Sequence, residues 1–198
     1  MNEDLVLASA SPRRRELLER VGLRLRVVPS NLDETPVPGE APRDYVQRVA
    51  REKCLACLEP ALPVLAADTT VILDGRILGK PASADEAQSM LTRLAGRRHE
   101  VTTAYCVRHK DRRIERAVTT QVSFRLLDPN EVEAYVVCKE WDGKAGGYAI
   151  QGIAAAFVTD VRGSITNVIG LPLAEVIADL RALDALPTYP PRAFGGPS

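Results

Sequence analysis

The sequence predicts an α/β protein, and three observations support this fold class. Short apolar runs typical of strands alternate along the chain with segments that have helical periodicity. Residues 101–108 and 114–127 are rich in Val, Thr and aromatic side chains, which predicts a long antiparallel hairpin. The chain has 198 residues, and at ~150 residues per domain this indicates one domain, or one domain with two lobes.

The N-terminal segment predicts a strand, a loop and a helix. Residues 5–8 form a short apolar run, and Leu17, Leu18 and Val21 then follow at helical spacing. Ser11 suits the N-cap and Pro12 the first helical position, while Gly22 supplies the left-handed residue that commonly ends a helix. A second strand is expected at 25–29, followed by a polar loop at 30–42.

The next segment predicts a helix and then a strand buried on both faces. Apolar residues recur at steps of three and four over 43–59, which indicates an amphipathic helix. Residues 64–73 form an almost continuous apolar run that only Asp68 interrupts. Asp74-Gly75 then predicts a hairpin turn.

Two later helices begin at capping sequences. Ser83 and Glu86 have the spacing of a capping box and open a helix that reaches Gly96. The same pattern at 128–131 opens another helix. Strands are expected at 157–158 and 168–169, followed by a last amphipathic helix at 173–186. Residues 187–198 are rich in Pro and Gly, and we expect this tail to be disordered after a single two-lobed domain at 1–186.

Composition excludes several classes of protein. The 26 basic and 26 acidic side chains give zero formal net charge, so neither a nucleic acid polymer nor a membrane surface is an expected partner. No apolar run approaches the ~20 residues of a membrane span, and residues 1–4 lack the basic region of a secretory signal. We therefore expect a cytoplasmic protein. Four cysteines are too few for a disulfide scaffold.

The segment from Ser9 to Arg15 predicts an anion site. It lies where a strand hands over to a helix, and free backbone N–H groups and the positive end of the helix dipole point out of such a junction. The hydroxyl groups of Ser9 and Ser11 and the guanidinium groups of Arg13 and Arg14 could complete a phosphate site. The alternative is an ordinary capped helix with a solvated basic first turn.

Asp68, with Thr69 beside it, is the strongest single candidate for chemistry. A carboxylate inside a buried apolar run costs several kcal/mol unless it is paired, hydrogen-bonded or bound to a metal. The alternative is that Asp68 lies at an exposed strand end and caps a turn. Asp33 and Glu34 could join Asp68 in holding a hard cation, because Mg2+ takes carboxylates together with substrate phosphates and water, although loop acids are usually just solvated.

Two lysines are candidates for binding phosphate. Lys53 lies inside the apolar stripe of its helix, so its amine either reaches the rim of the core or points into a polar cleft. Lys80 follows the predicted hairpin, where a solvated loop lysine is the alternative. Gln151 ends a Gly-rich segment at 143–152 and could recognise the polar edge of a base, although a connection rich in turns would have a similar sequence.

Other catalytic motifs find no support in the sequence. Cys54 and Cys57 lie on the predicted buried stripe of a helix with no second close pair, which favours small core side chains over a zinc site. Neither G-x-x-x-x-G-K-[ST] nor G-x-G-x-x-G occurs, which argues against P-loop and Rossmann nucleotide sites. A G-x-S-x-G motif is also absent.

Eight short blocks follow one another over about residues 5–180. They are 7–18, Asp33-Glu34, Tyr45-Val46 with Ala50 and Lys53, 67–69, 79–81, 99–103, 144–152 and 170–172. In this order they resemble the Maf family of nucleoside triphosphate pyrophosphatases, and the shared order makes the set far more specific than any one block. Arg13, Thr69 and Gln151 resemble the specificity positions of the branch that acts on dTTP and UTP.

The resemblance implies a fold, a reaction and roles for residues. It implies a mixed twisted sheet with flanking helices, two lobes around a cleft as in the inosine triphosphate pyrophosphatases, and a homodimer. It implies hydrolysis of dTTP, UTP and related pyrimidine nucleotides to a monophosphate and pyrophosphate, with Mg2+ or Mn2+, as a housecleaning activity. Asp68 resembles the group that accepts a proton from water or orients metal-bound water, Glu34 resembles a metal ligand, and the triphosphate clamp corresponds to Arg13, Lys53 and Lys80.

Two other functions remain open at this stage. The family name derives from an association with septum formation, so a regulatory interaction protein is one alternative. A pyrophosphatase of the branch that acts on 7-methyl-GTP is the other.

Overall fold

The structure is a computed structural model, and it describes residues 3–30, 32–59, 61–186 and 188–190. Most of the predicted disordered tail, at 187 and 191–198, lies outside these residues. The chain divides into two compact units. The first unit comprises residues 1–68, 104–117 and 170–198, and the second comprises 69–103 and 118–169. The prediction of a single domain with a cleft between two lobes stays a prediction.

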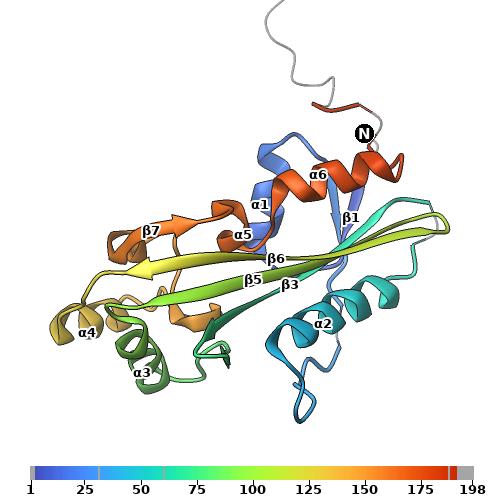
Figure 1. Cartoon of the computed structure of the whole chain (residues 1–198). Coiled ribbons are helices and arrows are strands. Elements are labelled where there is room, and N and C mark those ends of the chain that lie inside the picture. Colours follow the sequence, from blue (N-terminus) through green and yellow to red (C-terminus); the bar gives the residue numbers. More distant parts are fainter. Residues whose placement is uncertain (1–2, 31, 60, 187, 191–198) are drawn as a thin grey trace, which may run out of the picture. The chain divides into compact units, whose positions relative to one another are not determined.

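The seven strands form one mixed sheet, which confirms the predicted α/β class (Figure 1). The strand order is β2-β1-β3-β5-β6-β7, and β4 also pairs with β3. β1 is parallel to β2 and β3, whereas β3 with β4 and β6 with β7 are antiparallel. The strands are β1 (Leu5–Leu7), β2 (Leu25–Val27), β3 (Val64–Leu73), β4 (Arg76–Leu78), β5 (Arg98–His109), β6 (Arg112–Phe124) and β7 (Val158–Arg162).

The helices follow the predicted starting points closely. Pro12 and Pro129 each lie in the first turn of a helix, and Asp128 and Glu131 form both bonds of the expected capping box. The helices are α1 (Pro12–Arg20), α2 (Pro42–Ala56), α3 (Ala84–Leu94), α4 (Pro129–Val137), α5 (Ile165–Ile169) and α6 (Leu173–Ala182), with short 3-10 helices η1 (Ala145–Gly147) and η2 (Ile153–Phe157). Among the described residues, no helix is long and apolar enough to cross a membrane.

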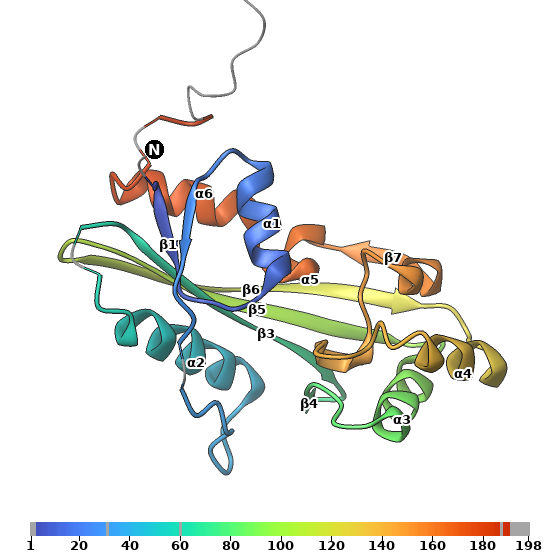
Figure 2. The same cartoon turned by 180° about the vertical axis from the view of Figure 1, so that it is seen from behind.

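In the first unit, α1 joins the parallel strands β1 and β2, as a parallel pair requires a crossover connection (Figure 2). One apolar cluster joins β1 and β3 to α2 and includes Cys54, Cys57 and Cys106. All three thiols are free and buried, which agrees with the interpretation of Cys54 and Cys57 as core side chains. The N-terminal half of β3 is therefore fixed against α2, the helix that carries Lys53.

In the second unit, a larger core packs α3 and α4 against β3, β5 and β6. The rings of His99, Phe124 and Tyr148 meet edge to face, with centroids 4.9–5.4 Å apart. His99 Nε2 lies 2.7 Å from Tyr148 Oη in a buried hydrogen bond. This core fixes the C-terminal half of β3 and the N-terminal part of β5.

Three predictions about local structure were wrong. Residues 168–169 lie in α5 and not in a strand, and Ser164 Oγ accepts a hydrogen bond from Asn167 N in its first turn. The helix predicted at 43–59 ends at Ala56, which leaves Leu58 91% exposed. The last helix ends at Ala182 and not at 186. In each case two or three apolar residues fitted the pattern of the predicted strand or helix, but the backbone hydrogen bonds of that element do not include them.

Candidate active site

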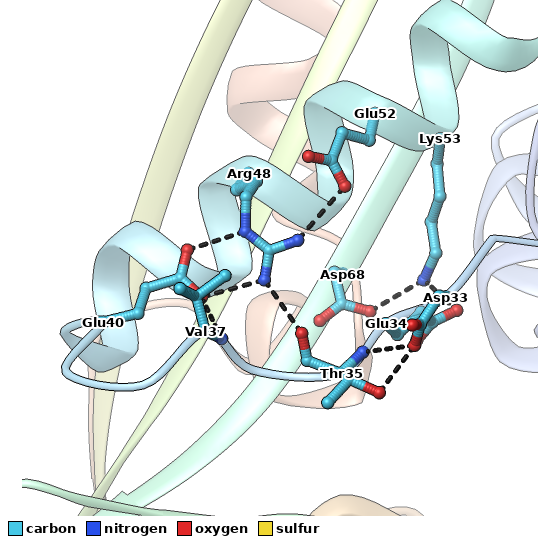
Figure 3. Close-up of polar contacts among 9 residues, drawn as sticks. All are labelled: Asp33, Glu34, Thr35, Val37, Glu40, Arg48, Glu52, Lys53 and Asp68. Atoms are coloured by element: carbon cyan, nitrogen blue, oxygen red, sulfur yellow. Dashed lines mark hydrogen bonds and ion pairs between the residues drawn. The ribbon is translucent and has the colours of Figure 1, made fainter.

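Lys53 connects two carboxylates in the first unit. Its Nζ lies 2.8 Å from Glu34 Oε1 and 3.0 Å from Asp68 Oδ1 (Figure 3). Lys53 comes from α2, Asp68 from the middle of β3 and Glu34 from the loop between β2 and α2. The structure thus places Asp68 inside the strand, and not at an exposed end, and directs Lys53 to polar partners.

Burial makes this cluster energetically demanding. Lys53 is 7% exposed and Asp68 is 9% exposed, whereas Glu34 is half-buried. Removing one partner of a buried ion pair typically costs 3–5 kcal/mol, about the size of a large core deletion. The same carboxylates affect the hydroxyl of Tyr45. Burial raises the pKa of this hydroxyl, and the negative charges of Asp68 and Glu34 raise it further, to about 12. Lys53 and Asp68 thus place opposite charges among the buried apolar side chains of β3 and α2.

Arg48 holds the loop that carries Glu34. Its guanidinium donates two hydrogen bonds to the Glu40 carboxylate, at 2.7 and 2.8 Å, and one to the carbonyl oxygen of Thr35 at 3.2 Å (Figure 3). It also contacts Glu52 on α2 at 3.2 Å. These contacts, with the Glu40 hydrogen bond as the largest cause, raise the pKa of Arg48. Arg48 therefore fixes the loop to α2, the helix from which Lys53 meets Glu34.

Glu34 and Asp68 are the candidate ligands for a divalent cation. Among the described residues, no group of three or more His, Cys, Asp or Glu side chains is arranged to hold a metal. Asp33 instead accepts hydrogen bonds from Thr35 N and Oγ1, at 2.9 and 2.6 Å, and forms a local turn. Glu34 and Asp68 converge on one ammonium group, and two carboxylates fit Mg2+ where phosphate oxygens and water supply the remaining ligands.

The junction of β1 and α1 is the predicted connection of a strand, a loop and a helix, and the anion site expected there stays a prediction. Arg14 is buried, and it donates hydrogen bonds from Nη1 to Ser9 Oγ at 3.0 Å and from Nε to the Gly170 carbonyl at 2.8 Å. Ser11 takes the N-cap position without a side-chain capping bond. Arg13 is half-buried, and burial lowers the pKa of both guanidinium groups. The junction thus gathers desolvated cations at the N-terminus of α1.

The remaining candidates, Thr69, Lys80 and Gln151, belong to the second unit. Lys80 and Gln151 are exposed, and Thr69 is half-buried. The Gly-rich segment packs beside the segment that carries Lys80, because Gly146 N donates to the Gly79 carbonyl at 2.9 Å. Gly146 has φ +70°, and a Cβ there would lie 2.9 Å from Val71 Cγ2, so the glycine is required by close packing.

Sequence reasoning missed Arg48 and the polar residues that surround Thr69. Arg48 is one of many arginines in the chain, and its spacing of eight residues from Glu40 matches no capping or helical-pair rule. Thr103 and Asn167 contact each other through a bond that spans 64 residues of sequence. The only available signal was that Thr103 lies in block 99–103 of the family resemblance, whereas Asn167 lies in none of the blocks.

Comparison with known proteins places the chain in a family. The model of the Maf family, described as Maf-like protein, matches residues 4–183. Because this match covers most of the chain, the protein belongs to the Maf family, which confirms the resemblance inferred from the eight blocks.

Individual relatives agree with this assignment. A protein of Anaeromyxobacter dehalogenans named dTTP/UTP pyrophosphatase is 55% identical over 181 residues, which cover 89% of this chain and 92% of the relative. A protein of the same name from Cereibacter sphaeroides is 52% identical and covers 93% of this chain and 97% of its own length. A Ham1 protein structure from Staphylococcus aureus aligns with 61% of this chain and 71% of its own, at 15% identity and a TM-score of 0.41. The family assignment does not depend on that partial likeness.

Proposed function

We propose that this protein hydrolyses dTTP and UTP to the nucleoside monophosphate and pyrophosphate, with a divalent metal ion. The single observation that carries the proposal is the buried cluster in which Lys53 contacts both Glu34 and Asp68. The names of relatives that are 52–55% identical supply the substrate class. Housecleaning of the nucleotide pool is the corresponding role.

The charges of the cluster suit the requirements of this reaction. A nucleoside triphosphate carries nearly four negative charges, which must be neutralised before a nucleophile can approach phosphorus. A bound Mg2+ or Mn2+, held by Glu34 and Asp68, would supply charge neutralisation and a lower pKa for water. Lys53 contacts the same two carboxylates and would bind a phosphate oxygen or keep Asp68 in place. Asp68 accepts the proton of the attacking water, the water oxygen bonds to the α-phosphorus, and the bond between the α- and β-phosphates breaks with pyrophosphate as leaving group.

Other predicted residues take roles in binding. Arg13 and Lys80 bind the triphosphate as cations, and Ser9, Ser11 and Arg14 form the junction of β1 and α1 around it. Thr69 and Gln151 contact the base. The proposal also includes a homodimer, which the family resemblance implies, and a cytoplasmic location, which agrees with a formal net charge of zero.

The test is pyrophosphate release from a panel of nucleoside triphosphates, with Mg2+ or Mn2+ and with chelator. We expect metal-dependent release from dTTP and UTP by the wild type. Asp68→Asn should lower kcat by about 10³-fold, the usual size of a general-base contribution, while the variant keeps its fold by circular dichroism. Asp111→Asn, which changes an exposed acid, is the matched control and should keep full activity. Retention of most activity by Asp68→Asn would contradict the catalytic role, and no release from any nucleotide would refute the proposed reaction.

A further inference from the structure

A chain of neutral hydrogen bonds runs from Thr69 into the interior of the second unit. Thr69 Oγ1 lies 2.9 Å from Thr103 Oγ1, and Thr103 Oγ1 lies 3.0 Å from the carbonyl oxygen of Asn167. Thr103 and Asn167 are both fully buried, at 0% exposure. The chain thus connects β3, β5 and α5, and it begins at the residue that directly follows Asp68.

The direction of these hydrogen bonds follows from counting hydrogens. A carbonyl oxygen only accepts, so Thr103 must donate its single hydroxyl hydrogen to Asn167. Thr103 can then only accept in its bond with Thr69, which makes Thr69 the donor. Any further partner of Thr69 Oγ1 must therefore approach it as a donor, because the hydrogen of this hydroxyl is already committed.

Asn167 anchors the far end of the chain. Its Nδ2 donates to the Val101 carbonyl at 3.0 Å and to Thr120 Oγ1 at 3.0 Å, which fixes the orientation of the amide. Its backbone N donates to Ser164 Oγ at 3.2 Å. If Thr103 turned its hydrogen toward Thr69, the buried carbonyl of Asn167 would lose this donor, at the usual cost of an unpaired buried group. The buried end, at Asn167, thus sets the direction in which the hydrogen bonds from Thr69 to Thr103 and Asn167 run.

We propose that Thr103, held by Asn167, is a positioning residue that makes Thr69 a hydrogen-bond acceptor toward the base. The inference rests on the proposed function. Uracil and thymine carry one donor on the edge of the ring, N3–H, whereas cytosine carries a lone pair at N3 and its donors on the 4-amino group. The proposal assigns Thr69 to the N3 position. A Thr69 that only accepts binds N3–H and repels the lone pair of cytosine. It is equally unsuited to a phosphate oxygen, which also needs a donor.

The test is the ratio of kcat/KM for UTP to kcat/KM for CTP in wild type and variants. Thr103→Val keeps the volume of the side chain but removes the acceptor, so the hydroxyl of Thr69 can turn and donate to N3 of cytosine. We expect the ratio to fall about tenfold, the equivalent of one hydrogen bond. Thr103→Ser retains the hydroxyl and should restore the wild-type ratio. A purely structural defect would lower both constants together and leave the ratio unchanged.

The neighbouring threonine provides a matched control. Thr102 Oγ1 lies 2.9 Å from Thr119 Oγ1, so Thr102→Val removes a similar bond from the same strand without touching the chain that begins at Thr69. It should keep the wild-type ratio. Thr103→Ala repeats the measurement if Thr103→Val does not fold.

The outcomes separate this inference from the proposed function. If the wild type hydrolyses UTP and the Thr103 variants keep its ratio, the role of Thr103 is refuted and the reaction stands. An equal fall of the ratio in Thr102→Val would also refute it. If the wild type releases no pyrophosphate from any nucleotide, the reaction and the inference are both refuted.

Discussion

The two units of the molecule bury different kinds of polar side chain. Within the described residues of the first unit, the buried polar side chains include four charged ones, and in the second unit all are neutral. The first set is Ser9, Arg14, Lys53, Asp68 and Asp179, and the second set is Thr70, His99, Thr102, Thr103, Thr120 and Asn167.

The difference suggests a division of tasks. Buried charges interact strongly over several ångströms and suit the neutralisation of phosphate and metal ions. Neutral donors and acceptors depend on direction and suit discrimination between bases that differ in one hydrogen. The proposed catalytic cluster in the first unit and the chain from Thr69 in the second unit are the two clearest examples.

We expect the largest effect on activity when Lys53 loses its charge. Lys53→Met leaves Glu34 and Asp68 without their shared cation, and we expect kcat/KM for UTP to fall by about 10³-fold, the upper range for loss of one electrostatic contact in a catalytic site. Steady-state pyrophosphate release measures the effect. Arg51→Met, on the exposed face of the same helix, is the matched control and should stay within about twofold of wild type. A Lys53→Met enzyme with more than a tenth of wild-type activity would show that the charge is dispensable.

The neutrality of the second unit predicts a dependence of stability on pH. Burial lowers the pKa of His99 to about 4 from its ordinary 6.5, and the residue is only 2% exposed. Between about pH 4 and pH 6.5, His99 therefore binds a proton in the unfolded chain but not in the folded protein. This contribution to stability is fully present above about pH 6.5 and is lost as the pH falls toward 4, with a total of about 3 kcal/mol.

His99→Gln isolates this contribution, because Gln keeps a polar partner for Tyr148 Oη but does not titrate. Denaturant unfolding at pH 7 and pH 4.5 should show a loss of free energy that is about 2 kcal/mol smaller in the variant than in wild type. Carboxylates shared by both proteins cancel in this difference. Equal losses in the two proteins would mean that folded His99 accepts a proton as readily as the unfolded chain does.

A smaller effect is expected at Asp179, a buried charge of the first unit to which we assign a role in stability and not in catalysis. Asp179 accepts hydrogen bonds from Arg116, at 2.6 and 2.8 Å, and from Tyr105 Oη at 2.7 Å. Burial raises the pKa of Asp179, but these hydrogen bonds outweigh burial and hold it below its ordinary value. Asp179→Asn should lower the free energy of unfolding by about 1–2 kcal/mol at pH 7, because Arg116 is largely solvated.

Asp184→Asn is the control for this variant, since Asp184 forms an exposed pair with Arg112 at 3.2 Å. It should change stability by less than about 0.5 kcal/mol. Both variants should keep wild-type kcat with UTP. A loss of kcat in folded Asp179→Asn would extend the catalytic charge system to α6.

The charged part of the site could be predicted from the sequence because charges conflict with their surroundings. Asp68 interrupts an apolar strand and Lys53 interrupts an apolar helical stripe, and the structure joins the two at 3.0 Å. Glu34 was a weaker prediction, because a loop acid has no apolar pattern to violate. Its position depends on Arg48, whose contacts no periodic rule predicts.

The neutral part could not be predicted from the residues alone. Thr103 lies in a strand, where Thr is common for its β-branched shape, so nothing in the sequence distinguishes a hydrogen-bonding hydroxyl from a packing methyl group. Asn167 lies in a helix of five residues, too short for a periodic signal, and its β-branched neighbours led to the wrong prediction of a strand at 168–169. Directional networks of this kind become visible only when distant segments are placed together.

Gly146 has a consequence for how the family's sequences evolve. Val71 occupies the space that a Cβ at position 146 would need, and the backbone there has a positive φ. An alignment of relatives should therefore show covariation: any side chain gained at 146 should be accompanied by a smaller residue at 71. A glycine in a segment that ends at a candidate base-binding residue would then record the history of a packing contact.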